Sequence, residues 1–443
     1  MQWISRLGTL LLIAAMATPA QAQIEFVEYD MDNGMHVILH QDNTTPIVAV
    51  SVLYHVGSKN EIPGRTGFAH FFEHLLFEGS ENIARGEYMK LIQANGGALN
   101  ANTTQDRTFY YEVLPSNQLE LGLWMESERM FHPIIDIDGV ETQRQVVKEE
   151  KRMRVDNQPY GSWIANMFSH AFTDHNYRWA VIGSMEDLDA AQLDEFLAFN
   201  KKYYGPSNAT LSIAGDLDIE QTKAWVEKYF GSIPASGAVE RPSKEERPLA
   251  GEIVDTIYDN VQLSAVFAGY RIPGETHPDA YALGMLNTVL SDGPSSRLSV
   301  RMVDEDQTAV QVFAFPYTLE DHGLFISLAL PNGEFQNDTL LATMDAEIQR
   351  LQNELISERE YTKILNKIEA QFVSSNGSVR GIAESLANYH VYYGDANLIN
   401  TEIERYRAVT REDIQRVAQA YLNPNNRVVL HYLPKPSENP AVE

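Results

Sequence analysis

Hydrophobic positions along this chain change between a strand-like and a helical spacing, which predicts a mixture of sheets and amphipathic helices. Val48 to Tyr54 is a β-branched apolar run of strand length. The segment from Phe68 to Leu76 is mostly apolar, and Glu141 to Met153 is a strongly helical run rich in charges. These elements predict an α+β fold in which helices pack against largely antiparallel sheets.

The same order of patterns occurs twice, which implies a duplicated domain. A strand pattern soon reaches Pro-Gly-x-Thr in each half, and an aromatic and Asn-rich turn later precedes an apolar strand in each half. The matching segments are 48–54 with 261–267, 63–66 with 273–276, 203–208 with 421–426, and the strands that end at Ile213 and Leu430. We therefore expect two homologous domains, residues 23–233 and 252–443, joined by an exposed linker at 234–251 that is rich in proline and charge.

The start of the chain predicts export. Arg6, the apolar stretch Leu7 to Ala17 and Pro19 to Ala22 are typical of a signal peptide over residues 1–22. The mature protein is then exported, and periplasmic in a Gram-negative bacterium, with an uncleaved anchor as the alternative. No later segment approaches the roughly 18 uninterrupted apolar residues of a transmembrane helix, so none is expected in the mature chain.

Composition excludes some functions. The net charge of −27 argues against nucleic-acid binding, which needs clustered Lys and Arg. The absence of Cys excludes disulfides and thiol nucleophiles, so the core alone must hold the fold.

One short motif carries the candidate chemistry: His70-Phe71-Phe72-Glu73-His74. The two histidines are four residues apart, so on a helix they point the same way and can bind one metal ion. Glu73 lies beside them and could take a proton from a zinc-activated water, and the order is that of the inverzincins. The alternative is a helix whose histidines only satisfy core hydrogen bonds. The other histidines, including His36 and His390, show no ligand-like spacing and are interpreted as ordinary surface or core residues.

A catalytic zinc usually has a third protein ligand, for which Glu149 and Glu150 are the candidates. If Val146, Val147 and Met153 mark the inward face of their helix, Glu150 shares that face. We therefore expect Glu150 to be the ligand, with a solvated run of charges as the alternative.

The chain resembles the pitrilysin-type, insulinase-like zinc metallopeptidases, in which a ligand glutamate follows His-x-x-Glu-His by about 75 residues. The resemblance covers the whole mature chain and also rests on segments 96–103, 106–111, 177–183 and 295–298. It implies one Zn²⁺ per chain, bound by His70, His74 and Glu150, with Glu73 as the general base. It further implies that Asn100, Ala101, Asn102 and Thr103 line the substrate cleft. An exposed edge there would pair with an extended peptide, whereas an internal strand is the alternative.

The second half lacks a metal site, and the chain departs from the family pattern in two places. In an ungapped comparison His70, Glu73 and His74 face Ala280, Leu283 and Gly284, so the second half has no matching metal ligands. Val303 and Val310 stand where the family has an Arg and a Tyr that assist hydrolysis, and Arg301 lies nearby without the Tyr. Gln143 replaces a glutamate that supports the zinc site, which should weaken the site modestly.

Through the resemblance, the missing Arg and Tyr pair implies the zinc-bearing member of a two-chain clamshell, of which this chain forms one half. A homologous partner would supply Arg and Tyr. The expected function is a zinc endopeptidase subunit that hydrolyses peptides or unfolded segments in a closed chamber. The alternative is a non-catalytic structural or peptide-binding subunit of the same fold.

Overall fold

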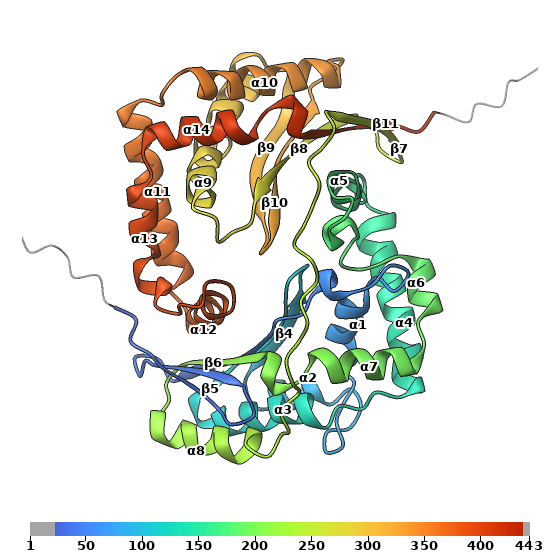
Figure 1. Ribbon diagram of the computed structural model, residues 1–443, viewed down its shortest axis with the longest axis vertical. Coiled ribbons are helices and arrows are strands. Elements are labelled where there is room, and N and C mark those ends of the chain that lie inside the picture. Colours follow the sequence, from blue (N-terminus) through green and yellow to red (C-terminus); the bar gives the residue numbers. More distant parts are fainter. Residues whose placement is uncertain (1–22, 437–443) are drawn as a thin grey trace, which may run out of the picture.

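A computed structural model describes residues 23–436, and the predicted signal peptide lies outside this range. The chain forms two sheets, one of six strands and one of five, which lie in opposite halves of the molecule (Figure 1). Both are largely antiparallel with helices packed against them, so the predicted α+β architecture is confirmed. Within residues 23–436 no helix combines the length and the apolar character that membrane crossing demands.

The first sheet has the strand order β1-β2-β6-β3-β5-β4. Only β2 and β6 are parallel to each other, and all other neighbours are antiparallel. β4 is an edge strand, and its register pairs Asn102 with Phe109 of β5. The strands are β1 Val27–Asp30, β2 His36–Gln41, β3 Ile47–Tyr54, β4 Ala98–Thr103, β5 Thr108–Pro115 and β6 Ala209–Gly215.

The second sheet repeats this topology in the order β7-β11-β8-β10-β9, again with one parallel pair, β7 with β11. Its strands are β7 Ile253–Asp259, β8 Ala265–Pro273, β9 Ala309–Thr318, β10 His322–Pro331 and β11 Arg427–Pro434. The position of β8 corrects the strand expected at 261–267, because β8 begins four residues later and runs directly into Gly274. The duplication is right, but the register of this strand in the sequence comparison is wrong.

The two chain segments that lead into the central strands β6 and β11 have the same local structure. Asn208 donates a side-chain hydrogen bond to the carbonyl of Tyr203 at 2.8 Å, and Asn426 donates one to the carbonyl of Tyr421 at 3.0 Å. Each Asn ends a short 3-10 turn after a helix and comes directly before its strand. The shared Tyr and Asn pattern in the sequence thus corresponds to a shared helix-turn-strand geometry.

Helices cover both sheets. In the first half they are α1 Phe68–Leu75, α2 Tyr88–Ala94, α3 Leu119–Phe131, α4 Ile137–Lys151, α5 Trp163–Ala171, α6 Met185–Ala190, α7 Leu193–Tyr203 and α8 Ile219–Phe230. In the second half they are α9 Asp279–Leu290, α10 Asn337–Asn353, α11 Glu358–Ser375, α12 Val379–Asn388, α13 Leu398–Ala408 and α14 Arg411–Tyr421. Short 3-10 or π segments are η1 Ser58–Asn60, η2 Ser116–Gln118, η3 Arg152–Asp156, η4 Asn176–Arg178, η5 Pro206–Asn208, η6 Ser299–Glu305, η7 Tyr389–Tyr393 and η8 Pro424–Asn426.

Each half lends one helix to the sheet of the other half. α12 packs on β3 and β6 of the first sheet, where Ile382 and Leu386 are buried with Ala49. α5 packs on β8 and β11 of the second sheet, where Met167 and Phe168 are buried. The predicted boundary thus divides the sequence into two halves, but each half also packs a helix on the sheet of the other.

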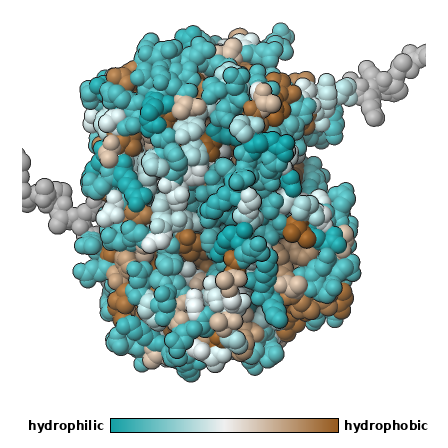
Figure 2. Space-filling view, in the orientation of Figure 1, coloured by the Kyte–Doolittle hydropathy of each residue, from teal (hydrophilic) through white to brown (hydrophobic). Residues whose placement is uncertain are grey.

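The segment between the halves has no helix or strand over residues 234–249 and runs along the molecule from one sheet to the other (Figure 1). It is nevertheless fixed at several points. Arg241 donates to Asn208 Oδ1 at 2.8 Å, and Glu246 accepts from the backbone N–H of His175 at 2.7 Å. The face of the molecule in Figure 2 is mainly hydrophilic with small hydrophobic areas, as expected for a chain of net charge −27.

Candidate metal centre

The helix that carries the motif, α1, is short and is held at both ends by buried charged residues. Its N-cap residue Gly67 has φ 91°, and the side chain of Glu61 accepts hydrogen bonds from the backbone N–H groups of Gly67 and Ala69, both at 2.9 Å. At the other end Arg129 donates to the carbonyl of Leu76 at 2.6 Å. Accepting N–H groups at the start and donating to a carbonyl at the end both satisfy backbone groups that have no partner within the helix. Sequence reasoning identified neither Glu61 nor Arg129, because nothing in their local sequence distinguishes them from surface charges.

Apolar packing fixes the rotation of α1. Phe68, Phe71 and Phe72 are buried against the aromatic ring of Phe196 of α7, with ring centroids 4.6 to 5.8 Å apart. With that face in the core, the face that carries His70 and His74 is directed at α4.

Three side chains converge where α1 meets α4. His70 Nε2 lies 3.5 Å and His74 Nε2 lies 3.1 Å from Glu150 Oε2. The ligand atoms of all three residues lie within 4.8 Å of one another, and all three side chains are partly buried. The two imidazole rings are nearly perpendicular, at 77°, with centroids 4.9 Å apart.

The structure places Glu150 rather than Glu149 beside the histidines, but not for the full reason given by the sequence. Val147 is buried, whereas Val146 is 43% and Met153 is 60% exposed, so these two do not mark the inward face. That face consists of Val140, Gln143, Arg144, Val147 and Glu150. Met153 is not on the inward face because α4 is followed by the π segment η3 after Lys151, which changes the helical phase. Glu149 is exposed and pairs with Arg152 at 3.1 Å.

The donor set fits a zinc ion. His70 Nδ1 and Glu150 Oε2 are buried without a hydrogen-bond partner among the described residues, although His74 Nε2 is within 3.1 Å of that oxygen. Burial lowers the pKa of His70 to about 4, which keeps its imidazole neutral, the form that binds metals. The adjacent His74 ring holds the pKa of Glu150 below its usual value, so this carboxylate is ionised. Two imidazoles and one carboxylate are a ligand set that zinc commonly takes in catalytic sites.

Glu73 lies on the same helix and contacts β4. Its Oε2 accepts a hydrogen bond from Thr103 Oγ1 at 2.7 Å, which fixes the carboxylate next to the metal ligands. Burial raises the pKa of Glu73, so it is a stronger proton acceptor than an exposed glutamate. Thr103, predicted as a cleft residue, thus positions the predicted general base.

The remaining predicted cleft residues, Asn100, Ala101 and Asn102, lie on β4 beside Thr103 and are at least partly exposed. The edge position of β4 in the described sheet favours an exposed edge over an internal strand. Their contact with substrate stays a prediction.

Gln143 lies seven residues before Glu150 on the same face of α4. It contacts a residue other than the candidate ligands. Its amide donates to Glu78, which in turn pairs with Arg85 at 2.6 Å. The carbonyl oxygen of Gln143 is buried without a partner among residues 23–436. A glutamate at this position would stand against the carboxylate of Glu78, which gives a local electrostatic reason for the amide.

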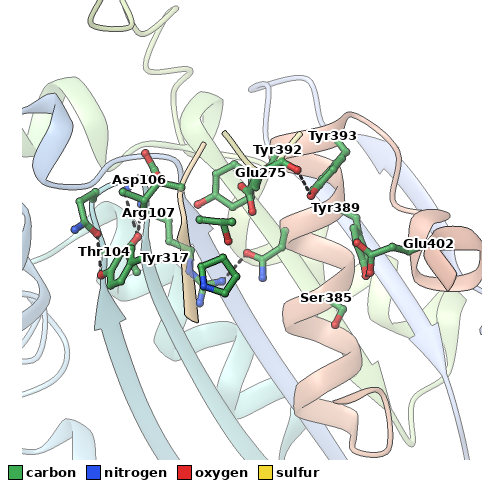
Figure 3. A pocket seen from close by; sticks show the side chains of 15 residues that line it. Thr104, Asp106, Arg107, Glu275, Tyr317, Ser385, Tyr389, Tyr392, Tyr393 and Glu402 are labelled. Atoms are coloured by element: carbon green, nitrogen blue, oxygen red, sulfur yellow. Dashed lines mark hydrogen bonds between the residues drawn. The ribbon is translucent and has the colours of Figure 1, made fainter. Parts of the chain in front are cut away.

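A separate polar cavity of about 530 Å³ begins at Thr104, directly after β4 (Figure 3). It lies between the turns of the two sheets and α12, and Glu275, Tyr389, Tyr392 and Glu402 line it. None of the three candidate ligands lines this cavity.

Comparison with known proteins identifies the family. Residues 36–184 match insulinase (peptidase family M16), and residues 190–368 match the peptidase M16 inactive domain. The zinc protease PqqE of Helicobacter pylori is 30% identical over 408 residues, which are 91% of this chain and 92% of that protein. This chain belongs to peptidase family M16.

Solved structures confirm the fold. A protease from Helicobacter pylori superposes with a TM-score of 0.89 at 30% identity, over 93% of this chain and all of that chain. The periplasmic protease PqqL from Escherichia coli shares the fold at 17% identity with a TM-score of 0.76, and the match covers 92% of this chain but 47% of that one. A protein of Mycobacterium leprae named as an uncharacterized zinc protease is 27% identical over 89% of this chain and 88% of that protein.

Proposed function

We propose that this chain is the zinc-bearing, catalytic subunit of an exported M16 endopeptidase. One observation carries the proposal: His70, His74 and Glu150 converge within 4.8 Å, and Glu73 adjoins them on the same helix. The names of similar proteins, zinc proteases in several bacteria, support it. Export and a periplasmic location rest on the sequence of residues 1–22 and are part of the proposal.

The side chains divide the work of peptide hydrolysis. His70, His74 and Glu150 would hold Zn²⁺, which when bound supplies Lewis acidity that polarises a carbonyl and acidifies water. Glu73 accepts the proton of the attacking water and later returns it to the leaving amine. The hydrogen bond from Thr103 holds Oε2 of Glu73, which leaves Oε1 free for that proton.

The substrate would be an extended peptide or an unfolded segment bound along β4. An edge strand offers unpaired backbone groups, and pairing with them reads little sequence, so length and flexibility would select substrates inside a closed chamber. Thr103 ends β4 and touches Glu73, so a peptide aligned on this strand would have its backbone next to the general base.

A homologous partner chain would complete the site. Val303 and Val310 stand where an Arg and a Tyr are expected, and Val310 is 51% exposed on β9. A chain without these groups lacks donors for the negative charge that develops on the carbonyl oxygen. We therefore propose a heterodimer in which the partner supplies the pair.

The test compares wild type with Glu73→Gln, Glu150→Gln and Glu149→Gln, each purified alone and in complex with the co-purifying partner. Zinc per chain is measured by elemental analysis. The rate of hydrolysis is measured with an unfolded protein substrate. Glu73→Gln should keep zinc and lose hydrolysis, whereas Glu150→Gln should lose one zinc. Glu149→Gln, an exposed neighbour on α4, should lose neither. Hydrolysis by Glu73→Gln at the wild-type rate would refute the assigned base.

A non-catalytic subunit is the second candidate function. Val303, Val310 and the bond between Gln143 and Glu78 favour it, because each departs from the pattern of an active peptidase. It predicts that wild type binds zinc but that neither the chain nor its purified complex hydrolyses peptides.

A further inference from the structure

A second cluster of metal-ligating side chains lies far from α1, where the first sheet meets η7. Glu28 of β1, His36 at the start of β2 and His390 of η7 bring one ligand atom each within 4.8 Å of the others. The imidazole rings of His36 and His390 are parallel within 6°, with centroids 3.4 Å apart. The sequence interpretation of both as ordinary histidines is therefore incomplete, because they are 354 positions apart and meet only in the fold.

The hydrogen bonds of His36 prepare one ring nitrogen for a metal. Its Nδ1 lies 2.7 Å from Asp30 Oδ1, and its Nε2 lies 3.3 Å from Glu28 Oε2. A carboxylate at Nδ1 holds the proton there and leaves the Nε2 lone pair directed at Glu28, which is how proteins commonly orient a ligand histidine.

His390 contributes the second nitrogen. Among residues 23–436 no group forms a hydrogen bond with its ring. The ring instead stacks on that of His36. In the stacked arrangement the in-plane lone pairs of the two rings run side by side, so binding of one divalent cation together with Glu28 requires one ring to rotate about its side-chain torsions.

We propose that Glu28, His36 and His390 form a second divalent metal site that binds Zn²⁺. Imidazole ligands select zinc and other late transition metals over Ca²⁺ and Mg²⁺, which take oxygen ligands. The Glu28 side chain is 43% exposed and His36 is 12% exposed, so the site is open to solvent on the side of Glu28.

Such a site would join the two halves of the chain. His36 and Glu28 belong to the first sheet, while His390 directly follows α12, the helix that the second half packs on β2, β3 and β6. The unfolded chain does not hold these three residues together, so zinc would bind the folded form and stabilise this contact in proportion to its concentration. This role is structural and does not depend on the proposed peptidase activity.

Equilibrium dialysis against micromolar zinc, followed by elemental analysis, tests the proposal on the full mature chain. Wild type should hold two zinc ions, His390→Gln one, Glu150→Gln one, and the double variant none. His132→Gln is the matched control, because His132 pairs with a single carboxylate, Glu81, and has no second imidazole as ligand. His36→Gln provides an independent variant, and circular dichroism shows whether each variant keeps its fold.

The melting temperature gives a second readout. Zinc should raise the melting temperature of Glu150→Gln in a concentration-dependent manner, and calcium should not. Adding His36→Gln or His390→Gln should remove the effect, and Glu28→Gln should weaken zinc binding at least about 10-fold. Equal zinc content in wild type, His36→Gln and His390→Gln would overturn the proposal. If Glu150→Gln is the only variant that loses zinc, the proposed peptidase site is supported and the second site is refuted.

Discussion

Replacing Lys59 by Met should be among the most destabilising single substitutions in this chain. Lys59 is 2% exposed, and its Nζ lies 2.9 Å from Asp106, 2.6 Å from Glu320 and 3.0 Å from Asp321. Lys59 and Asp106 belong to the first half, and Glu320 and Asp321 form the turn between β9 and β10 of the second. This ion cluster therefore joins the halves beside the end of β4.

The magnitude follows from burial. The side chains of Asp106 and Asp321 are 4% and 1% exposed, so Lys59→Met leaves buried carboxylates without their central cation. Removing one partner of a buried ion pair costs about 3–5 kcal/mol, and the nearby imidazole of His175, 3.3 Å from Asp321, offsets part of this. We expect a loss of about 3 kcal/mol in the free energy of unfolding at pH 7.

Denaturant unfolding measures this loss, with Lys228→Met as the control. Lys228 pairs with Glu120 on an exposed surface, so its substitution should cost far less than that of Lys59. If both substitutions lower the free energy of unfolding by the same small amount, the cluster around Lys59 does not hold the halves together and the reasoning is wrong.

The loss should also depend on pH. Burial alone would raise the pKa of Glu320, but His55 and Lys59 overcome it and lower this pKa to about 2. A carboxylate with a lowered pKa contributes stability above its unfolded pKa, and this contribution disappears as pH falls through the folded pKa. Because Met in place of Lys59 raises the pKa of Glu320, the difference between variant and wild type should shrink as pH falls from about 4.5 to 2.

Three further predictions concern the site and its surroundings. Gly67→Ala should cost about 1–3 kcal/mol in calorimetry and weaken zinc binding, because φ is +91° and a Cβ would lie 2.8 Å from the carbonyl of Ile182. Thr103→Val should keep zinc but lower kcat/KM about 10-fold or more, because it removes the hydrogen bond to Glu73; an unchanged rate would mean that this bond does not position the base. Burial, and then Asp106, raises the pKa of Glu275 to about 8, so the folded state retains a proton that the unfolded state has lost. Stability should therefore fall as pH rises from about 4.5 to 8, and Glu275→Gln should flatten this slope in melting temperatures measured against pH.

Features encoded within a few residues could be predicted from the sequence. The i, i+4 spacing of His70 and His74 brings the two rings together in the fold, and a charged helix supplies Glu150 beside them. The duplicated turns before β6 and β11 were recognisable because Tyr and Asn form the same local hydrogen bond in each. Such features depend on helix geometry and turn chemistry, which act over short distances along the chain.

Features that depend on tertiary packing could not be predicted. The change from α4 to η3 exposes Met153, and no composition signal marks where that π segment begins. Glu61 caps α1 from outside the helix, and His36 meets His390 only because α12 packs on the first sheet. In each case the partner lies outside the local pattern, so periodicity carries no information about it.

The duplication itself indicates why the polar residues of α1 are kept. α9 occupies in the second half the place of α1, next to β9 as α1 is next to β4, and Leu283 stands in the buried position that corresponds to Glu73. The second half therefore shows that this architecture is stable with apolar residues there, which avoids the cost of burying polar atoms without partners. Beside α1 the same fold accepts that cost at Glu150 Oε2, which faces His70 Nε2 at 3.5 Å and His74 Nε2 at 3.1 Å. A bound cation between the imidazoles and the carboxylate offsets the cost, so His70→Leu should bind less zinc yet unfold at no lower a temperature than zinc-free wild type.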